Sequence, residues 1–165
     1  MEYLKVIEES MLNTDAKYIA HQTNCVSDGS AGGIARIIFD AYPHADTYKG
    51  RLVKADPATI DVMGDGKEKR FVINMNSQYY PGTFNNAFSN DSRSKREQYF
   101  YKCLLEIAKI PNLESIAFPA GIGCALGGGD WEYYYGTIKN FAKYIFDSQK
   151  AVTYIYKLPG SSFEC

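Results

Sequence analysis

Two glycine-rich loops, about a hundred residues apart, carry the residue types best suited to hold an anion. Residues 29–35 read GSAGGIA and come shortly after residues 21–25, HQTNC, whereas residues 119–131 read PAGIGCALGGGDW. Each loop follows an apolar stretch predicted as a strand and leads into a predicted helix. Glycines let the backbone approach a ligand closely, and the start of a helix offers free N–H groups and a partial positive charge. The pair predicts a ligand that carries a diphosphate.

Three polar side chains beside these loops are candidates for chemistry, and each also has a structural interpretation. His21 ends an apolar strand, where it is either a hydrogen-bonded core residue or a general acid or base with a pKa near neutrality. Asn24 either orients a ligand by hydrogen bonding or makes an Asx-turn after its strand. Asp130 is either the N-cap of the next helix or a group that activates a water molecule.

The composition is that of a single globular domain. The chain has 165 residues, 45% hydrophobic and 22% charged, and its formal net charge is −1. That length suffices for one sizeable core. Without a broad basic field the chain is not expected to bind nucleic acid. We predict one domain over residues 1–158 and a loose tail over residues 159–165.

Cysteine and histidine usage points away from a metal site. The four cysteines form no CxxC pair and the chain has two histidines, so their spacing fits no zinc site. We therefore expect reduced cysteines, a cytoplasmic protein, and no metal ion or cofactor. No apolar run is long enough to suggest a membrane segment.

Strands and helices alternate along the chain. Strands are predicted at residues 3–7, from 17 to His21, at 59–63 and 70–74 as a hairpin, at 115–118 and at 152–156. Helices are predicted at residues 33–42, after a Ser94/Glu97 capping box, and after Asp130. Residues 78–92 are predicted as a long loop. This order predicts an α/β sandwich with helices on both faces and a ligand beyond the carboxyl ends of the strands.

At these residues the sequence resembles the macrodomains, the ADP-ribose-binding fold. The resemblance covers nearly the whole chain and rests on HQTNC, on Gly32-Gly33-Ile34-Ala35, on residues 121–128 and on Asp130-Trp131-Glu132. The histidine before the asparagine and the Gly-Asp-Trp-Glu run are similar to the branch of ADP-ribose 1″-phosphate phosphatases and the terminal ADP-ribose glycohydrolase. The resemblance implies a three-layer α/β/α sandwich with a mixed central sheet.

Three positions depart from the family pattern. Glu9 and Ser10 stand where the family usually has a Gly-Asp pair whose aspartate holds adenine. Residues 74–77, Asn-Met-Asn-Ser, contain no lysine where the glycohydrolase branch has one, and Gly127 replaces its loop aspartate. The lysine–aspartate mechanism is therefore not carried over to this chain.

The resemblance implies a set of site residues. Catalytic roles fall to His21 and Asp130. Ligand-binding roles fall to Ser10, Met11, Asn24, Gly32, Gly33, Ile34, Ala35, Ser77, Gly121, Ile122, Gly123, Cys124, Ala125, Leu126 and Gly127.

The function that the resemblance favours is removal of phosphate from ADP-ribose 1″-phosphate. Two alternatives stay open: hydrolysis of ADP-ribose from modified acceptors, and a reader or scavenger that binds ADP-ribose or a related nucleotide without chemistry. The expected partners are a small-molecule ligand (ADP-ribose or a derivative) and an ADP-ribosylated protein, with no nucleic acid and no membrane. We expect a monomer.

Overall fold

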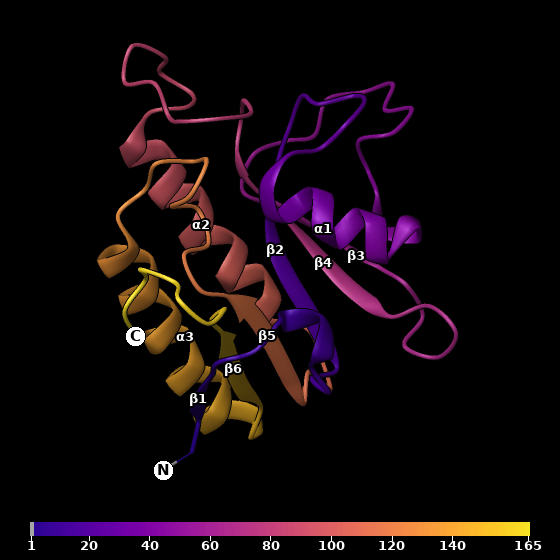
Figure 1. Ribbon diagram of the computed structural model, residues 1–165, viewed down its shortest axis with the longest axis vertical. Coiled ribbons are helices and arrows are strands. Elements are labelled where there is room, and N and C mark those ends of the chain that lie inside the picture. Colours follow the sequence, from indigo (N-terminus) through magenta and orange to yellow (C-terminus); the bar gives the residue numbers. More distant parts are fainter. Residues whose placement is uncertain (1) are drawn as a thin grey trace.

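The computed structural model describes residues 2–165, so the first residue of the predicted domain, Met1, lies outside them. A six-stranded sheet runs through the middle of the molecule in the order β1-β6-β5-β2-β4-β3 (Figure 1). The strands are β1 (Leu4–Ile7), β2 (Tyr18–Asn24), β3 (Thr59–Met63), β4 (Phe71–Gln78), β5 (Ser115–Pro119) and β6 (Val152–Tyr156). Neighbouring strands are parallel except β3, which pairs antiparallel with β4 at one edge. The sheet is mixed, as predicted.

Helices cover both faces of this sheet. They are η1 (Met11–Asn13), α1 (Gly33–Ala41), η2 (Pro43–Ala45), α2 (Arg93–Ala108) and α3 (Trp131–Gln149). Helix α1 and the two short 3-10 helices pack on one face, and α2 and α3 pack on the other. The prediction of a three-layer α/β/α sandwich is confirmed.

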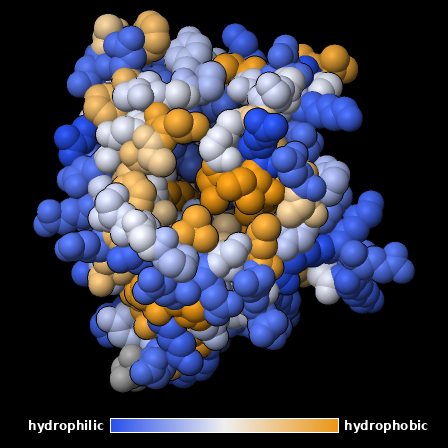
Figure 2. Space-filling model, in the orientation of Figure 1, coloured by the Kyte–Doolittle hydropathy of each residue, from blue (hydrophilic) through white to orange (hydrophobic). Residues whose placement is uncertain are grey.

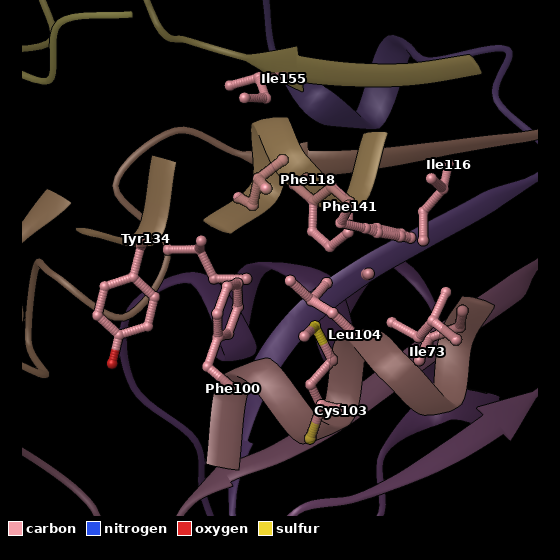
Figure 3. Close-up of a cluster of buried hydrophobic side chains, with 14 of the residues drawn as sticks. Ile73, Phe100, Cys103, Leu104, Ile116, Phe118, Tyr134, Phe141 and Ile155 are labelled. Carbon is pink, nitrogen blue, oxygen red and sulfur yellow. The ribbon is translucent and has the colours of Figure 1, made fainter. Parts of the chain in front are cut away.

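The larger core lies between the sheet and the pair α2 and α3 (Figure 3). Phe100 and Leu104 from α2 meet Phe141 and Ile138 from α3 over the buried strand residue Phe118. These apolar positions recur at helical spacing, so each helix buries one stripe and leaves its other face in water. The core holds β2, β4 and β5 in place, and the two glycine loops leave the ends of β2 and β5.

Helix α2 begins two residues earlier than its predicted capping box. Ser92, not Ser94, is the N-cap, and its hydroxyl accepts a hydrogen bond from the Lys95 N–H at 3.1 Å. Arg96, in the first turn of this helix, faces inward and is 2% exposed. The apolar periodicity of α2 did not predict that Arg96 is buried, because a charged residue interrupts the apolar stripe.

The C-terminal segment is packed on the domain. The Phe163 ring lies against Gly121 and 6.1 Å from the Trp131 ring, and the Trp131 indole donates to the Glu164 carbonyl at 2.9 Å. Figure 1 shows this segment beside α3. Residues 159–165, expected as a loose tail, thus contact the second glycine loop and the start of α3.

Candidate functional site

A cleft of about 420 Å³ opens between the two glycine loops, past the carboxyl ends of β5, β2 and β4. Figure 2 shows a hollow near the middle of this face, with hydrophobic residues along its border. In a doubly wound α/β sheet this edge is the usual place for a ligand. The residues that line it are Gln22, Asn24, Ser27, Ser30, Ala31, Gly32, Gly33, Ile34, Ala35, Ile37, Tyr48, Gln78, Pro81, Gly82, Pro119, Ala120, Gly121, Ile122, Gly123, Cys124, Ala125, Leu126 and Gly127.

The first glycine loop presents the start of α1 to this cleft. Gly32 is the N-cap and makes no side-chain capping bond. Gly33 has a φ of +57°, which favours glycine. Within residues 2–165 no backbone or side-chain oxygen accepts the N–H groups of Gly33, Ile34 or Ala35. These are the free donors that a helix start offers to an anion.

The second glycine loop is folded tightly on itself. Gly121 and Gly123 both have a φ of +77°. The Cys124 N–H donates to the Gly121 carbonyl at 2.8 Å, and the Gly129 N–H donates to the Gly123 carbonyl at 3.0 Å. A Cβ at Gly123 would lie 2.8 Å from the buried Tyr134 ring, so only glycine fits there. Successive backbone N–H groups in such a turn form a concave anion site.

A buried ion pair fixes the second loop to the long loop before α2. Arg96 and Asp91 are 2% and 1% exposed and pair at 2.7 Å. The same guanidinium donates to the carbonyls of Tyr80 at 3.1 Å and Gly82 at 2.7 Å, and it reaches that of Gly127 at 3.5 Å. One arginine therefore ties together two segments that border the cleft.

Asn24 lines the cleft, but much of its side chain is engaged locally. Its Oδ1 accepts from the N–H groups of Val26 at 3.0 Å and Ser27 at 2.7 Å, and its Nδ2 donates to the Ser27 hydroxyl at 2.9 Å. This is the Asx-turn that the sequence left as the alternative. The turn directs the chain from β2 into the first glycine loop.

His21 lies beneath the cleft and does not line it. The side chain is fully buried, and the ring packs edge-on against Phe39 of α1. Its Nε2 lies 2.6 Å from Asn74 Oδ1, and because Asn74 Nδ2 donates to the Ala45 carbonyl, Nε2 is the protonated nitrogen. Burial lowers the pKa of His21 from 6.5 to about 4, against the effect of the Asn74 bond. The structure thus gives the neutral core histidine that was the alternative interpretation.

Four other predicted residues also lie away from the cleft lining. Asp130 is the N-cap of α3, accepts from the Glu132 N–H at 3.1 Å and pairs with Arg93 at 3.2 Å. Ser10 caps η1, and Met11 is buried against the core on the α1 side. Ser77 is fully buried and donates to Gln22 at 2.8 Å. The remaining ligand candidates, Asn24, residues 32–35 and residues 121–127, are brought together around the cleft.

The sequence analysis missed several residues of the lining. Gln22, within β2, and Gln78, at the end of β4, contribute their amides, and the Tyr48 hydroxyl accepts from the Asn24 N–H at 2.7 Å. Burial raises the pKa of Tyr48 to about 12. Gln22 lies within the HQTNC run, so its place in that motif was the available signal. Gln78 follows the strand predicted at residues 70–74, and that place at the strand end was its signal. Tyr48 reaches the cleft through the tertiary fold and had no such signal.

No metal centre is evident in the part of the chain that the structure describes. Among residues 2–165 no three His, Cys, Asp or Glu side chains gather into a metal-binding cluster. Within the same residues no helix is long and apolar enough to cross a membrane.

Comparison with known proteins gives the fold. No protein-family model matches the sequence, and no curated protein matches it. A Bacteroides thetaiotaomicron protein of unknown function has a similar structure, with a TM-score of 0.70 and 21% identity over 94% of this chain and 98% of that one. The macrodomain of Mycobacterium tuberculosis DarG is similar at a TM-score of 0.69 and 19% identity, over 95% and 98% of the two chains. A mutant Oceanobacillus iheyensis macrodomain solved with ADPR is similar at a TM-score of 0.67 and 16% identity, over 95% of this chain and 86% of that one. Likeness at these identities speaks for the fold.

Proposed function

We propose that this chain, whose fold is that of the macrodomains, binds ADP-ribose or a derivative of it in the cleft between the two glycine loops. The observation that carries the proposal is the row of N–H groups at the start of α1, which line the cleft without a protein acceptor. A diphosphate supplies the negative oxygens that such donors and the helix dipole favour.

The neutrality of the cleft supports recognition through the backbone. None of the described residues that line it is charged. A diphosphate there would be held by amide donors rather than by arginine or lysine. The opposite glycine loop supplies a second set of backbone amides, so that each side of the cleft faces the ligand. The structurally similar Oceanobacillus iheyensis macrodomain mutant was solved with ADPR, which supports this class of ligand.

Removal of phosphate from ADP-ribose 1″-phosphate is the reaction to test within this proposal. Preorganised N–H groups stabilise negative charge that develops during such a reaction. Neither His21 nor Asp130 lines the cleft, so turnover would rely on those donors and on a water molecule held beside the ligand.

A binder without chemistry is the second candidate, and the titratable groups of the cleft favour it. Among the described lining residues these groups are Tyr48 and Cys124, and burial raises the pKa of each to about 12. A general acid or base works best with a pKa near the operating pH, which neither group has.

Phosphorus NMR of ADP-ribose and of ADP-ribose 1″-phosphate mixed with the protein tests both candidates. Saturable shifts of the diphosphate signals establish binding, and growth of free phosphate establishes the phosphatase. Shifts without free phosphate favour the binder. If the diphosphate signals do not shift at millimolar protein, the proposal of ADP-ribose binding is wrong.

A single backbone donor can be removed as a sharper test. Ile34→Pro deletes one free N–H in the first turn of α1, where proline is tolerated and no protein hydrogen bond is lost. Hydrogen bonds to charged groups contribute about 1.5–3 kcal/mol, so the affinity for ADP-ribose should fall about 10- to 100-fold. Ile34→Ala, which keeps the N–H and shortens the side chain, is the matched control and should retain most of the affinity.

A further inference from the structure

The C-terminal segment contacts both ends of the second glycine loop from outside the cleft. We call residues 161–165 the C-terminal strap, and none of these residues lines the cleft. We propose that the strap positions the second glycine loop, with Phe163 as the positioning residue, and that docking of the strap and occupancy of the cleft favour each other. The second part rests on the proposed function, because it needs a ligand between the loops.

Phe163 supports the start of the loop. Gly121 has a φ of +77° and no side chain, and a Cβ built on it would overlap the Phe163 ring. The ring therefore lies directly on the loop backbone, and it also packs against the larger core. The Gly121 carbonyl accepts the Cys124 N–H at 2.8 Å, so the ring contacts the residue that closes the first turn of the loop. Glycine has wide backbone freedom, and a ring packed on it removes part of that freedom.

Trp131 holds the strap at the other end of the loop. It is the first residue of α3 and is 9% exposed. Its indole N–H donates to the Glu164 carbonyl at 2.9 Å, and its ring lies edge-on to the Phe163 ring at 6.1 Å and stacks on Tyr135 at 5.4 Å. The strap therefore bridges the two ends of the loop. This contact gives the tryptophan of residues 130–132 a role outside the cleft.

The other contacts of the strap are few and local. The Ser161 N–H donates to the Leu158 carbonyl at 3.0 Å, and the Phe163 N–H donates to the Ser161 hydroxyl at 3.2 Å. The remaining three strap residues are exposed. A segment with so few buried contacts opens at a lower free energy than the core. The strap therefore has a docked and an undocked state.

The two states present the loop differently to a ligand. With the strap docked, the loop backbone is held at both ends and its N–H groups are preorganised for a diphosphate. With the strap undocked, Gly121 regains its freedom, and a ligand must order it at a cost in entropy. A ligand that prefers the docked form favours docking in return, because the coupling between two equilibria is reciprocal.

Calorimetric titration with ADP-ribose tests the coupling between the strap and the cleft. Phe163→Ala removes the ring and keeps the backbone carbonyl that bonds to Trp131. Its affinity for ADP-ribose should fall about 5- to 10-fold, at the lower end of the range that is usual for coupled sites. Phe163→Leu keeps an apolar side chain against Gly121 and should recover most of the lost affinity.

Phe146→Ala is the matched control. Phe146 is also a half-buried phenylalanine, near the end of α3, where its ring lies 6.4 Å from the Tyr3 ring and 5.3 Å from Lys150 Nζ. It does not line the cleft. We expect this variant to bind ADP-ribose as the wild type does. The Tm of the two alanine variants should fall by similar amounts, so that the difference in affinity does not come from overall stability.

Hydrogen exchange tests the positioning of the loop without any ligand. The amides of residues 121–124 should exchange faster in Phe163→Ala than in the wild type, because the loop has lost its support. In Phe146→Ala their exchange should stay as it is in the wild type.

The fluorescence of Trp131 tests the reciprocal effect of the ligand on the strap. Trp131 is the only tryptophan of the chain. Release of the strap exposes the indole to water, which moves its emission to longer wavelength. Phe163→Ala should show this shift, and saturating ADP-ribose should reverse part of it. A contact with a purely structural role would give no such response to the ligand.

Three results would overturn the positioning role of Phe163. Hydrogen exchange at residues 121–124 could be unchanged in Phe163→Ala, that variant could bind ADP-ribose as tightly as the wild type, or Phe146→Ala could lose as much affinity. An emission shift that ADP-ribose does not reverse would overturn the coupling. A wild type that does not bind ADP-ribose overturns the proposed function itself, and the exchange measurement then still decides whether the strap positions the loop.

Discussion

The two glycine loops face the same cleft but are built in opposite ways. The first, residues 29–35, is mostly exposed, and a Cβ on Gly29 would contact nothing within 4 Å. The second, residues 121–129, touches the Tyr134 ring at Gly123, the Phe163 ring at Gly121 and the Arg96 guanidinium at Gly127. Thr83 also donates to the Leu126 carbonyl at 3.1 Å.

The difference indicates that the two loops would hold the proposed diphosphate in different ways. The second loop is fixed before a ligand arrives, so it can offer its donors with little loss of entropy on binding. The first loop has few contacts of its own, and its position depends on α1 and on β2 beneath it. The Leu126 side chain is the point where they meet, because a Cβ on Gly33 would lie 2.8 Å from Leu126 Cδ1.

The largest effect should come from breaking the support of the second loop. Arg96→Met leaves Asp91 buried at 1% exposure without its partner. Breaking a buried ion pair in this way costs about 3–5 kcal/mol of unfolding free energy, measured by urea denaturation. Hydrogen exchange should rise at residues 121–128 more than at residues 29–35. The double variant with Asp91→Leu should recover part of the lost unfolding free energy. Equal hydrogen exchange in both loops would contradict the view that only the second loop depends on this ion pair.

Acid should instead destabilise the part of the protein beside the first loop, where His21 packs against α1. The pKa of His21 is about 4 in the folded protein and 6.5 as its ordinary value, so the unfolded chain binds more protons between these pH values. The stability that neutral His21 provides is thus complete above pH 6.5 and is lost as the pH falls towards 4, by about 3 kcal/mol in all.

The measurement is the unfolding free energy of the wild type and of His21→Leu across this pH range. The variant should have a flatter profile because it cannot take up the proton. Since the His21 ring packs on Phe39, exchange in α1 should rise first as the pH falls. If the unfolding free energy of the wild type depends on pH as little as that of the variant, the loss of stability in acid does not come from His21.

Adding one methyl group to each glycine loop should have its smallest effect at Gly33. Gly33→Ala and Gly123→Ala both place alanine at a positive φ, which costs about 1–2 kcal/mol. Gly123→Ala also meets the buried Tyr134 ring, and overpacking adds about 1–3 kcal/mol. At Gly33 the neighbour is the tip of the exposed Leu126, which can move away.

Thermal unfolding of both variants checks this difference. Gly29→Ala, which has neither a positive φ nor a neighbour, is the control and should stay within about 0.5 kcal/mol of the wild type. If Gly33→Ala proves as costly as Gly123→Ala, the first loop is as tightly held as the second.

Most of the elements could be predicted from the sequence because their signals are local. The hairpin from β3 to β4, the Asp130 cap of α3 and the start of α1 at Gly33 all lie where pattern and turn residues indicated. The start of α2 was misplaced because Ser92 and Ser94 are both acceptable N-caps, and in the structure Ser92 makes the capping bond, to the Lys95 N–H. Strand β4 runs to Gln78 rather than Asn74 because its polar end is buried by pairing with β2 and β3.

The sequence by itself determined the two glycine loops, the strands that lead to them and the free helix start at α1, since glycine spacing and apolar periodicity depend on near neighbours. Only the tertiary structure decided which polar side chains face the cleft. His21 and Gln22 are adjacent in one strand, yet alternation sends His21 under α1 and Gln22 to the cleft floor. A β-bulge at Ser77 then brings Gln78 beside Gln22, because strand pairing sets the register across 56 residues of chain.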